Sequence, residues 1–171
     1  MERLKRNNKI ALFIASILVL LGCSSQSMDD KFYKNYLGIN VLPEKQVFFY
    51  KEESAQNEGF SFEVIKYSTE GKLEIKKGYP IKDEYKQKWK IAEWQETPIN
   101  DKTEKDFDIV FKYSIENNDV KTKLDSLKKI IQKKGNYYCY YYKKSSDYVE
   151  AISLYVIDTQ ENELYIFNIE T

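Results

Sequence analysis

The chain has 171 residues, of which 42% are hydrophobic and 32% are charged, as is typical of a single folded domain and not of a disordered or multispan membrane protein. Its 27 Lys and Arg residues balance its 27 Asp and Glu residues, so no overall charge attracts nucleic acid. With no histidine and only two cysteines, the chain excludes histidine-based catalysis, histidine-containing metal sites and a disulfide-dense scaffold.

The first residues have the pattern of an export signal. Residues 1–9 carry four cations and one anion, and the twelve residues 10–21 that follow are apolar except for Ser16. At 1.5 Å per residue this run would extend ~18 Å as a helix, which is short of the ~30 Å needed to cross the hydrocarbon core. We therefore expect a cleaved signal peptide over residues 1–22 instead of a retained membrane span.

The end of this segment is more specific than an ordinary cleavage site. The sequence Leu20-Leu21-Gly22-Cys23 resembles the lipobox of bacterial lipoproteins, and the resemblance covers the signal segment only. It implies that a diacylglycerol is attached to the Cys23 thiol and that cleavage frees the Cys23 amine for further acylation. Two or three acyl chains anchor a protein stably. The alternative is an ordinary signal peptide in which Cys23 stands by accident.

The residues after Cys23 bear on location. In enteric sorting rules, Ser24 favours the outer membrane, with the domain facing the periplasm. In a Gram-positive cell the same signal would leave the domain on the outer face of the single membrane. Residues 24–27 are the only linker and span ~13 Å, so the domain is expected close to the bilayer.

Cleavage would also change the charge of the chain. It removes four cations and one anion from the balanced totals, which leaves a net charge of −3. Both arginines lie in the removed segment, so every remaining cation is a lysine. The absence of the bidentate arginine fork, together with export, argues against nucleic-acid binding.

The rest of the chain is expected to form one α+β domain over residues 28–171. A short helix is predicted over residues 28–37, with Gly38 as its stop. Strands are predicted over residues 46–51 and 60–64, and a turn at 68–71 leads to a further strand at 73–75. The segment around Trp89 and Trp94 is left unassigned.

Residues 107–115 fit two patterns. Apolar residues alternate for five positions, which favours a strand: Phe107, Ile109, Phe111, Tyr113 and Ile115. Helical spacing is also present, although it matches fewer positions: Phe107, Val110, Phe111 and Ile115. We predict a strand and keep the helix as the alternative.

One amphipathic helix is clear near residues 119–134. Its apolar stripe follows the spacing i, i+4, i+7 and i+11: Val120, Leu124, Leu127 and Ile131. Asn118 or Asp119 can cap its start, and Gly135 can end it. Strands at 137–142, 149–158 and 163–169 follow, the last two joined by a hairpin loop. These elements predict a mainly antiparallel sheet of about seven strands with two helices.

Cys139 is the first candidate for chemistry. A nucleophilic thiol needs a lowered pKa and usually a neighbouring base, and only Lys143 and Lys144 flank it. We therefore interpret Cys139 as a buried apolar residue. Pairing with Cys23 is excluded if that thiol is lipidated.

The tyrosine run at residues 137–142 is the second candidate. On a strand Tyr138, Tyr140 and Tyr142 share the face opposite Cys139. Because one helix layer cannot cover both faces of a sheet, we expect this row to point outward or toward the less covered face. It is the candidate binding surface for a protein or glycan partner. The alternative is ordinary packing of tyrosines against cross-strand neighbours.

No nucleotide-binding or hydrolase motif is present, and no catalytic residue, metal or cofactor is assigned. The sequence predicts a lipoprotein anchored to the bilayer through acylated Cys23, whose domain is a non-enzymatic binding module. One version is an immunity-type lipoprotein that blocks an incoming toxin. The alternative is a carboxylate-dependent envelope hydrolase, because paired carboxylates can hydrolyse glycosides.

Overall fold

The computed structural model describes residues 31–53, 59–81, 88–112, 116–145 and 148–170. The predicted signal peptide, the Leu20-Leu21-Gly22-Cys23 segment and the predicted tether after it lie outside the described residues. Within these ranges no helix has both the length and the apolar composition needed to cross a membrane.

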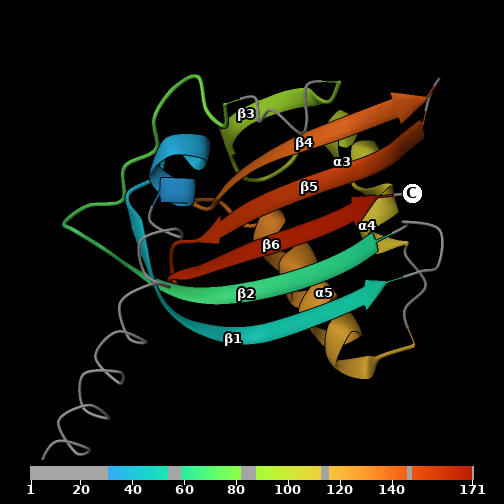
Figure 1. The fold of residues 1–171 in the computed structure, drawn as a ribbon, viewed down its shortest axis with the longest axis horizontal. Coiled ribbons are helices and arrows are strands. Elements are labelled where there is room, and N and C mark those ends of the chain that lie inside the picture. The colour runs from blue at the N-terminus through green and yellow to red at the C-terminus, as the bar shows by residue number, and fades with distance from the viewer. Residues whose placement is uncertain (1–30, 54–58, 82–87, 113–115, 146–147, 171) are drawn as a thin grey trace, which may run out of the picture.

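The described residues form one antiparallel sheet of six strands in the order β1-β2-β6-β5-β4-β3 (Figure 1). The strands are β1 (Val41–Glu53), β2 (Gly59–Thr69), β3 (Lys90–Glu96), β4 (Tyr137–Ser145), β5 (Tyr148–Asp158) and β6 (Glu163–Glu170). The mainly antiparallel sheet is confirmed, but the predicted count of about seven strands is wrong. Residues 73–75 contribute only an isolated bridge between Ile39 and Ile75, and the unassigned segment near Trp94 supplies edge strand β3.

Residues 101–111 form two short helices joined at Phe107, so the strand predicted from residue 107 is wrong in its described part. They form α3 (Asp101–Asp106) and α4 (Asp108–Phe111), and Tyr113 and Ile115 lie outside the described residues. The Asn100 side chain caps α3 by accepting a hydrogen bond from the Thr103 amide at 3.0 Å. Phe107 and Val110 are fully buried, as helical spacing requires.

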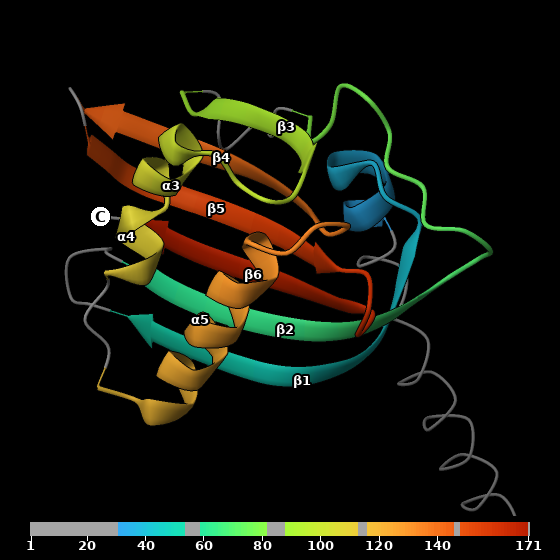
Figure 2. The ribbon, with the colours of Figure 1, turned by 180° about the vertical axis from the view of Figure 1, so that it is seen from behind.

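The amphipathic helix is confirmed as α5 (Asn118–Ile131), which ends before the predicted residue 134. Its cap is Asn117, one residue before the predicted cap, and its Oδ1 accepts from the amides of Asp119 and Val120 at 2.9 and 3.2 Å. The predicted stripe of α5 is buried against the sheet. Figure 2 shows α3, α4 and α5 on the same face of the sheet.

The other face of the sheet is covered as well, although without a long helix. A one-turn helix, η1 (Phe32–Leu37), ends at Gly38, whose φ of 67° supplies the left-handed stop that the sequence predicted. Behind η1 lies a second hydrophobic core that includes Tyr33, Leu37 and Trp89. The sheet therefore lies between two cores, and the expectation that only one face is well covered is wrong.

Candidate functional site

Strand β4 carries the predicted tyrosine row next to edge strand β3. The register pairs Tyr142 with Lys90, Tyr140 with Ala92 and Tyr138 with Gln95. Tyr138 and Tyr140 are only 1% and 5% exposed, on the face that bears α3, and Tyr142 is half-buried. The prediction that this row points outward or toward the less covered face is therefore wrong for Tyr138 and Tyr140, because α3 and α4 pack over them.

Cys139 lies on the opposite face and is a free, fully buried thiol, as the sequence predicted. Burial raises its pKa well above the ordinary value, which keeps the thiol protonated and unreactive. Its strand neighbour Tyr141 is buried in the same core, and its hydroxyl donates to the carbonyl of Ile81 at 2.5 Å. Residues on both faces of β4 therefore serve packing.

A polar groove of about 380 Å³ remains open where α3 meets β3 and β4. Its lining is dominated by hydrogen-bonding side chains, and it includes two members of the predicted tyrosine row: Ile91, Ala92, Glu93, Gln95, Asn100, Lys102, Thr103, Asp106, Tyr140 and Tyr142. The volume falls in the range of small-ligand sites. We term it the α3 groove.

The floor of the α3 groove is a buried carboxylate. Asp106 is 6% exposed and accepts a hydrogen bond from Lys144 Nζ at 2.6 Å and another from the Tyr140 hydroxyl at 3.2 Å. Burial raises the pKa of Tyr140, and the Asp106 carboxylate raises it further, so the phenol remains a donor at neutral pH. The Lys144 ammonium also lies 5.5 Å from the Tyr142 ring centroid. Asp106, Lys144 and Tyr140 therefore form a fixed floor of the groove in which the charges are paired.

Two amides in the groove wall are oriented by internal hydrogen bonds. Gln95 Oε1 accepts from the Tyr138 hydroxyl at 2.9 Å, and Asn100 Oδ1 accepts from the Thr103 amide. Neither amide nitrogen, nor the Lys102 ammonium, has a hydrogen-bond partner among the described residues. Because their acceptor oxygens are engaged, these side chains present mainly donors. The α3 groove is therefore suited to bind a polar molecule rich in acceptor oxygens.

The groove is less suited to hydrolysis by paired carboxylates. A glycosidase needs one carboxyl that gives up a proton and a second that attacks or activates water. Both oxygens of Asp106 accept hydrogen bonds from the protein, and Glu93 Oε2 accepts from the Gly78 amide at 3.2 Å. Within the described ranges, no group of three or more Cys, Asp or Glu side chains is arranged to hold a metal ion.

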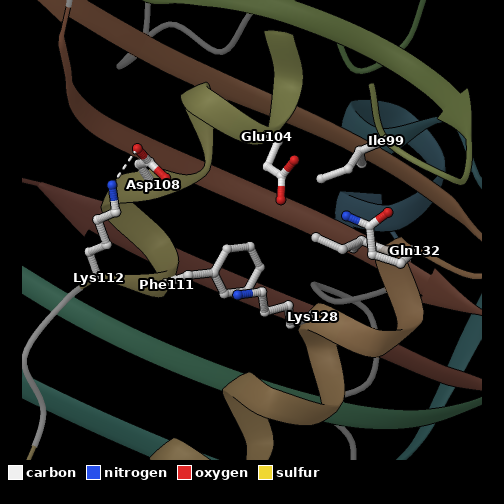
Figure 3. Close-up of a pocket in the computed structure, with 8 residues that line it drawn as sticks. Ile99, Glu104, Asp108, Phe111, Lys112, Lys128 and Gln132 are labelled. Atoms are coloured by element: carbon white, nitrogen blue, oxygen red, sulfur yellow. Dashed lines mark hydrogen bonds and ion pairs between the residues drawn. The ribbon is translucent and has the colours of Figure 1, made fainter. Parts of the chain in front are cut away.

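A second, smaller cavity of about 110 Å³ lies between α3, α4 and α5. Figure 3 shows Glu104, Lys128 and Gln132 around its opening. Asp108 and Lys112 form an ion pair of 2.7 Å at one side, and the Lys128 ammonium lies 5.9 Å from the Phe111 ring centroid. Apart from Glu104, the charged side chains around this cavity are thus already paired or lie against a ring. Because the space is also smaller than ordinary small-ligand sites, the α3 groove is the better candidate.

Most of the groove residues were not predicted from the sequence. Tyr140 and Tyr142 were singled out, whereas Asp106, Asn100 and Gln95 were not, and Lys144 was noted only for its position near Cys139. A usable signal was present at Asn100, because it precedes Asp101 and Glu104 in the pattern of a helix start. No protein-family model, curated protein or solved structure matches the chain.

Proposed function

We propose that the chain is a lipoprotein of the bacterial cell envelope, anchored through Cys23, whose folded domain is a non-enzymatic binding module. The observation that carries the anchor is the sequence Leu20-Leu21-Gly22-Cys23, which lies at the end of a short apolar run that follows a basic start. In a Gram-negative host, Ser24 supports an outer-membrane location with the domain in the periplasm.

The α3 groove supports the binding role. It is a preformed recess whose floor is held in place by Asp106, and its wall presents amide and ammonium donors. A protein loop or an envelope glycan supplies carbonyl or hydroxyl oxygens as acceptors for such donors. The immunity-type version is a special case in which the bound partner is a toxin.

The anchor is tested by substituting each of the two cysteines. Cys23→Ala should abolish incorporation of labelled palmitate and leave uncleaved precursor, because the acceptor thiol is lost. Cys139→Ala is the matched control and should still be labelled and processed, since Cys139 is fully buried in the folded domain. A Cys23→Ala protein that is still cleaved and still fractionates with membranes would contradict the proposed anchor.

The binding role is tested by reversing a charge in the groove wall. Lys102→Glu should reduce capture of envelope components by roughly thirtyfold in affinity, because it places a carboxylate among the donors. Lys121→Glu on the exposed side of α5 makes the same charge change away from the groove. Equal capture by the two variants, measured with purified bait and envelope extract, would show that the groove does not bind the partner.

A further inference from the structure

A lysine-rich and aromatic surface lies where the described chain begins. Tyr36 and Ile81 are each 38% exposed, and they lie side by side because the Ile81 amide donates to the Tyr36 carbonyl at 2.9 Å. Phe32 stacks on Tyr36 with ring centroids 6.1 Å apart. Exposed lysines complete what we term the η1 surface: Lys31, Lys34, Lys72, Lys76 and Lys77.

The lysines at residues 72–77 are held beside η1 by the backbone. The Lys76 amide donates to the Gly38 carbonyl at 2.9 Å, and the Asn40 side chain donates to the Lys72 carbonyl at 3.0 Å. A Cβ at Gly38 would meet Cγ of Tyr79 at 2.3 Å, so the two segments are in close contact. Figure 1 shows η1 and this loop at the same end of the sheet.

The charge of this region differs from that of the rest of the domain. None of the five lysines has an ion pair within the part of the chain that the structure describes. With their sequence neighbours Asp29, Asp30, Glu70 and Glu74, and with Glu93, whose Oε2 accepts from the Gly78 amide beside Lys77, the region carries no net charge, whereas the chain after residue 22 carries −3. The η1 end is therefore a lysine-rich, neutral end of an acidic domain.

The length of the tether limits how far this surface can lie from the acyl chains. Seven residues lie between Cys23 and Lys31, and the eight steps along the chain span at most ~29 Å even when fully extended. Aromatic and lysine side chains are favoured at the membrane interface, and each lysine near anionic headgroups adds attraction. Of the described surface, the η1 end is thus both the part nearest to the anchor and chemically suited to lipid.

We infer that the η1 surface lies against the bilayer, with anionic lipid headgroups as its partner. The inference rests on the proposed anchor at Cys23 and goes beyond it, because it assigns one face of the folded domain to the membrane. Tyr36 and Ile81 would enter the headgroup layer, and Lys34, Lys76 and Lys77 would contact lipid phosphates. The far end of the sheet, where β5 begins at Tyr148, would point away from the membrane.

Fluorescence quenching tests this orientation. The full chain is expressed, and its acylated form is purified and reconstituted into vesicles of phosphatidylglycerol and phosphatidylcholine with brominated acyl chains. The Tyr36→Trp variant should gain a signal that the bromolipids quench, above the background of Trp89 and Trp94. The Tyr148→Trp variant is the matched control, because Tyr148 is 78% exposed at the opposite end, and its added signal should not be quenched. If Tyr36→Trp does not fold, Ile81→Trp gives the same comparison.

Charge variants test the role of the lysines. Lys34→Gln with Lys77→Gln should remove the quenching, whereas Lys121→Gln with Lys129→Gln on α5 should leave it unchanged. Equal quenching at positions 36 and 148, or quenching that survives loss of Lys34 and Lys77, would overturn the inference. Mass spectrometry of the same samples reports acylation separately. Acylated protein without quenching contradicts only the orientation, and unacylated protein contradicts the anchor and the orientation together.

Discussion

Leu127→Ala is expected to lower the free energy of unfolding by ~2–5 kcal/mol. Leu127 lies in the middle of the buried stripe of α5 and has no exposed surface. Truncation removes apolar contacts with the core between α5 and the sheet and leaves a cavity that the surrounding side chains fill only in part. The change is measured as a shift in the denaturant midpoint at constant slope.

The matched control for Leu127→Ala is Lys129→Ala on the exposed side of the same helix. Because Lys129 is exposed, its truncation should change stability by no more than ~0.5 kcal/mol. A near-zero effect of Leu127→Ala, or equal effects of the two substitutions, would show that this face of α5 is not packed on the sheet.

The elements that the sequence predicted correctly are those whose local signals agree with one another. In α5 the apolar stripe, an asparagine cap and a glycine with positive φ after its last turn all indicate a helix. Strands β5 and β6 were predicted because apolar runs flank a polar hairpin loop at residues 158–162, and their antiparallel register confirms this. In both cases the tertiary structure preserves what the local sequence favours.

The errors come from segments in which a local pattern is ambiguous or interrupted. Phe107, Ile109 and Phe111 alternate by coincidence. The Asn100 cap starts α3, and the chain continues as α4 after Phe107. In β3 the register shifts between Ala92 and Gln95, which breaks the alternation that identifies a strand. Periodicity alone could not distinguish helix from strand in these two segments. The helices depend on the turn at Phe107 that joins them, and β3 depends on its register shift.

The candidate site could be predicted only in part, because it is assembled from distant segments. Asp106 and Lys144 are 38 residues apart in sequence, and they meet only because α3 packs beside β4. The burial of Tyr138 and Tyr140 was missed for a related reason. The opposite face of the sheet is covered by η1 and by the loop that contains Leu73 and Ile75. This loop has no regular hydrophobic periodicity, so the sequence did not indicate that it covers the sheet. Both faces of β4 are therefore covered from Tyr138 to Tyr141, and of the predicted tyrosine row only half-buried Tyr142 retains substantial exposure.

Tyr140→Ala is expected to cost ~3–5 kcal/mol of stability, as for other buried aromatic residues. The Tyr140 ring is 5% exposed and makes an edge contact with Phe107 at a centroid distance of 5.0 Å. Its loss would open a cavity beneath α3 and, among the described residues, leave Lys144 as the remaining side-chain partner of Asp106. The effect on melting temperature should therefore be large, and any loss of partner capture would follow from it.

Two further substitutions separate the contributions of the ring and the hydroxyl. Tyr140→Phe keeps the ring and removes the hydroxyl that donates to the Asp106 carboxylate, so it should cost ~1.5–3 kcal/mol. Tyr142→Ala removes a half-buried ring at the edge of the α3 groove and should cost less than Tyr140→Ala. A Tyr140→Ala protein as stable as the wild type would contradict the buried position of this ring. If Tyr140→Phe is as destabilising as Tyr140→Ala, the hydrogen bond to Asp106, and not packing of the ring, holds α3 against β4. The floor of the groove would then depend on that one carboxylate.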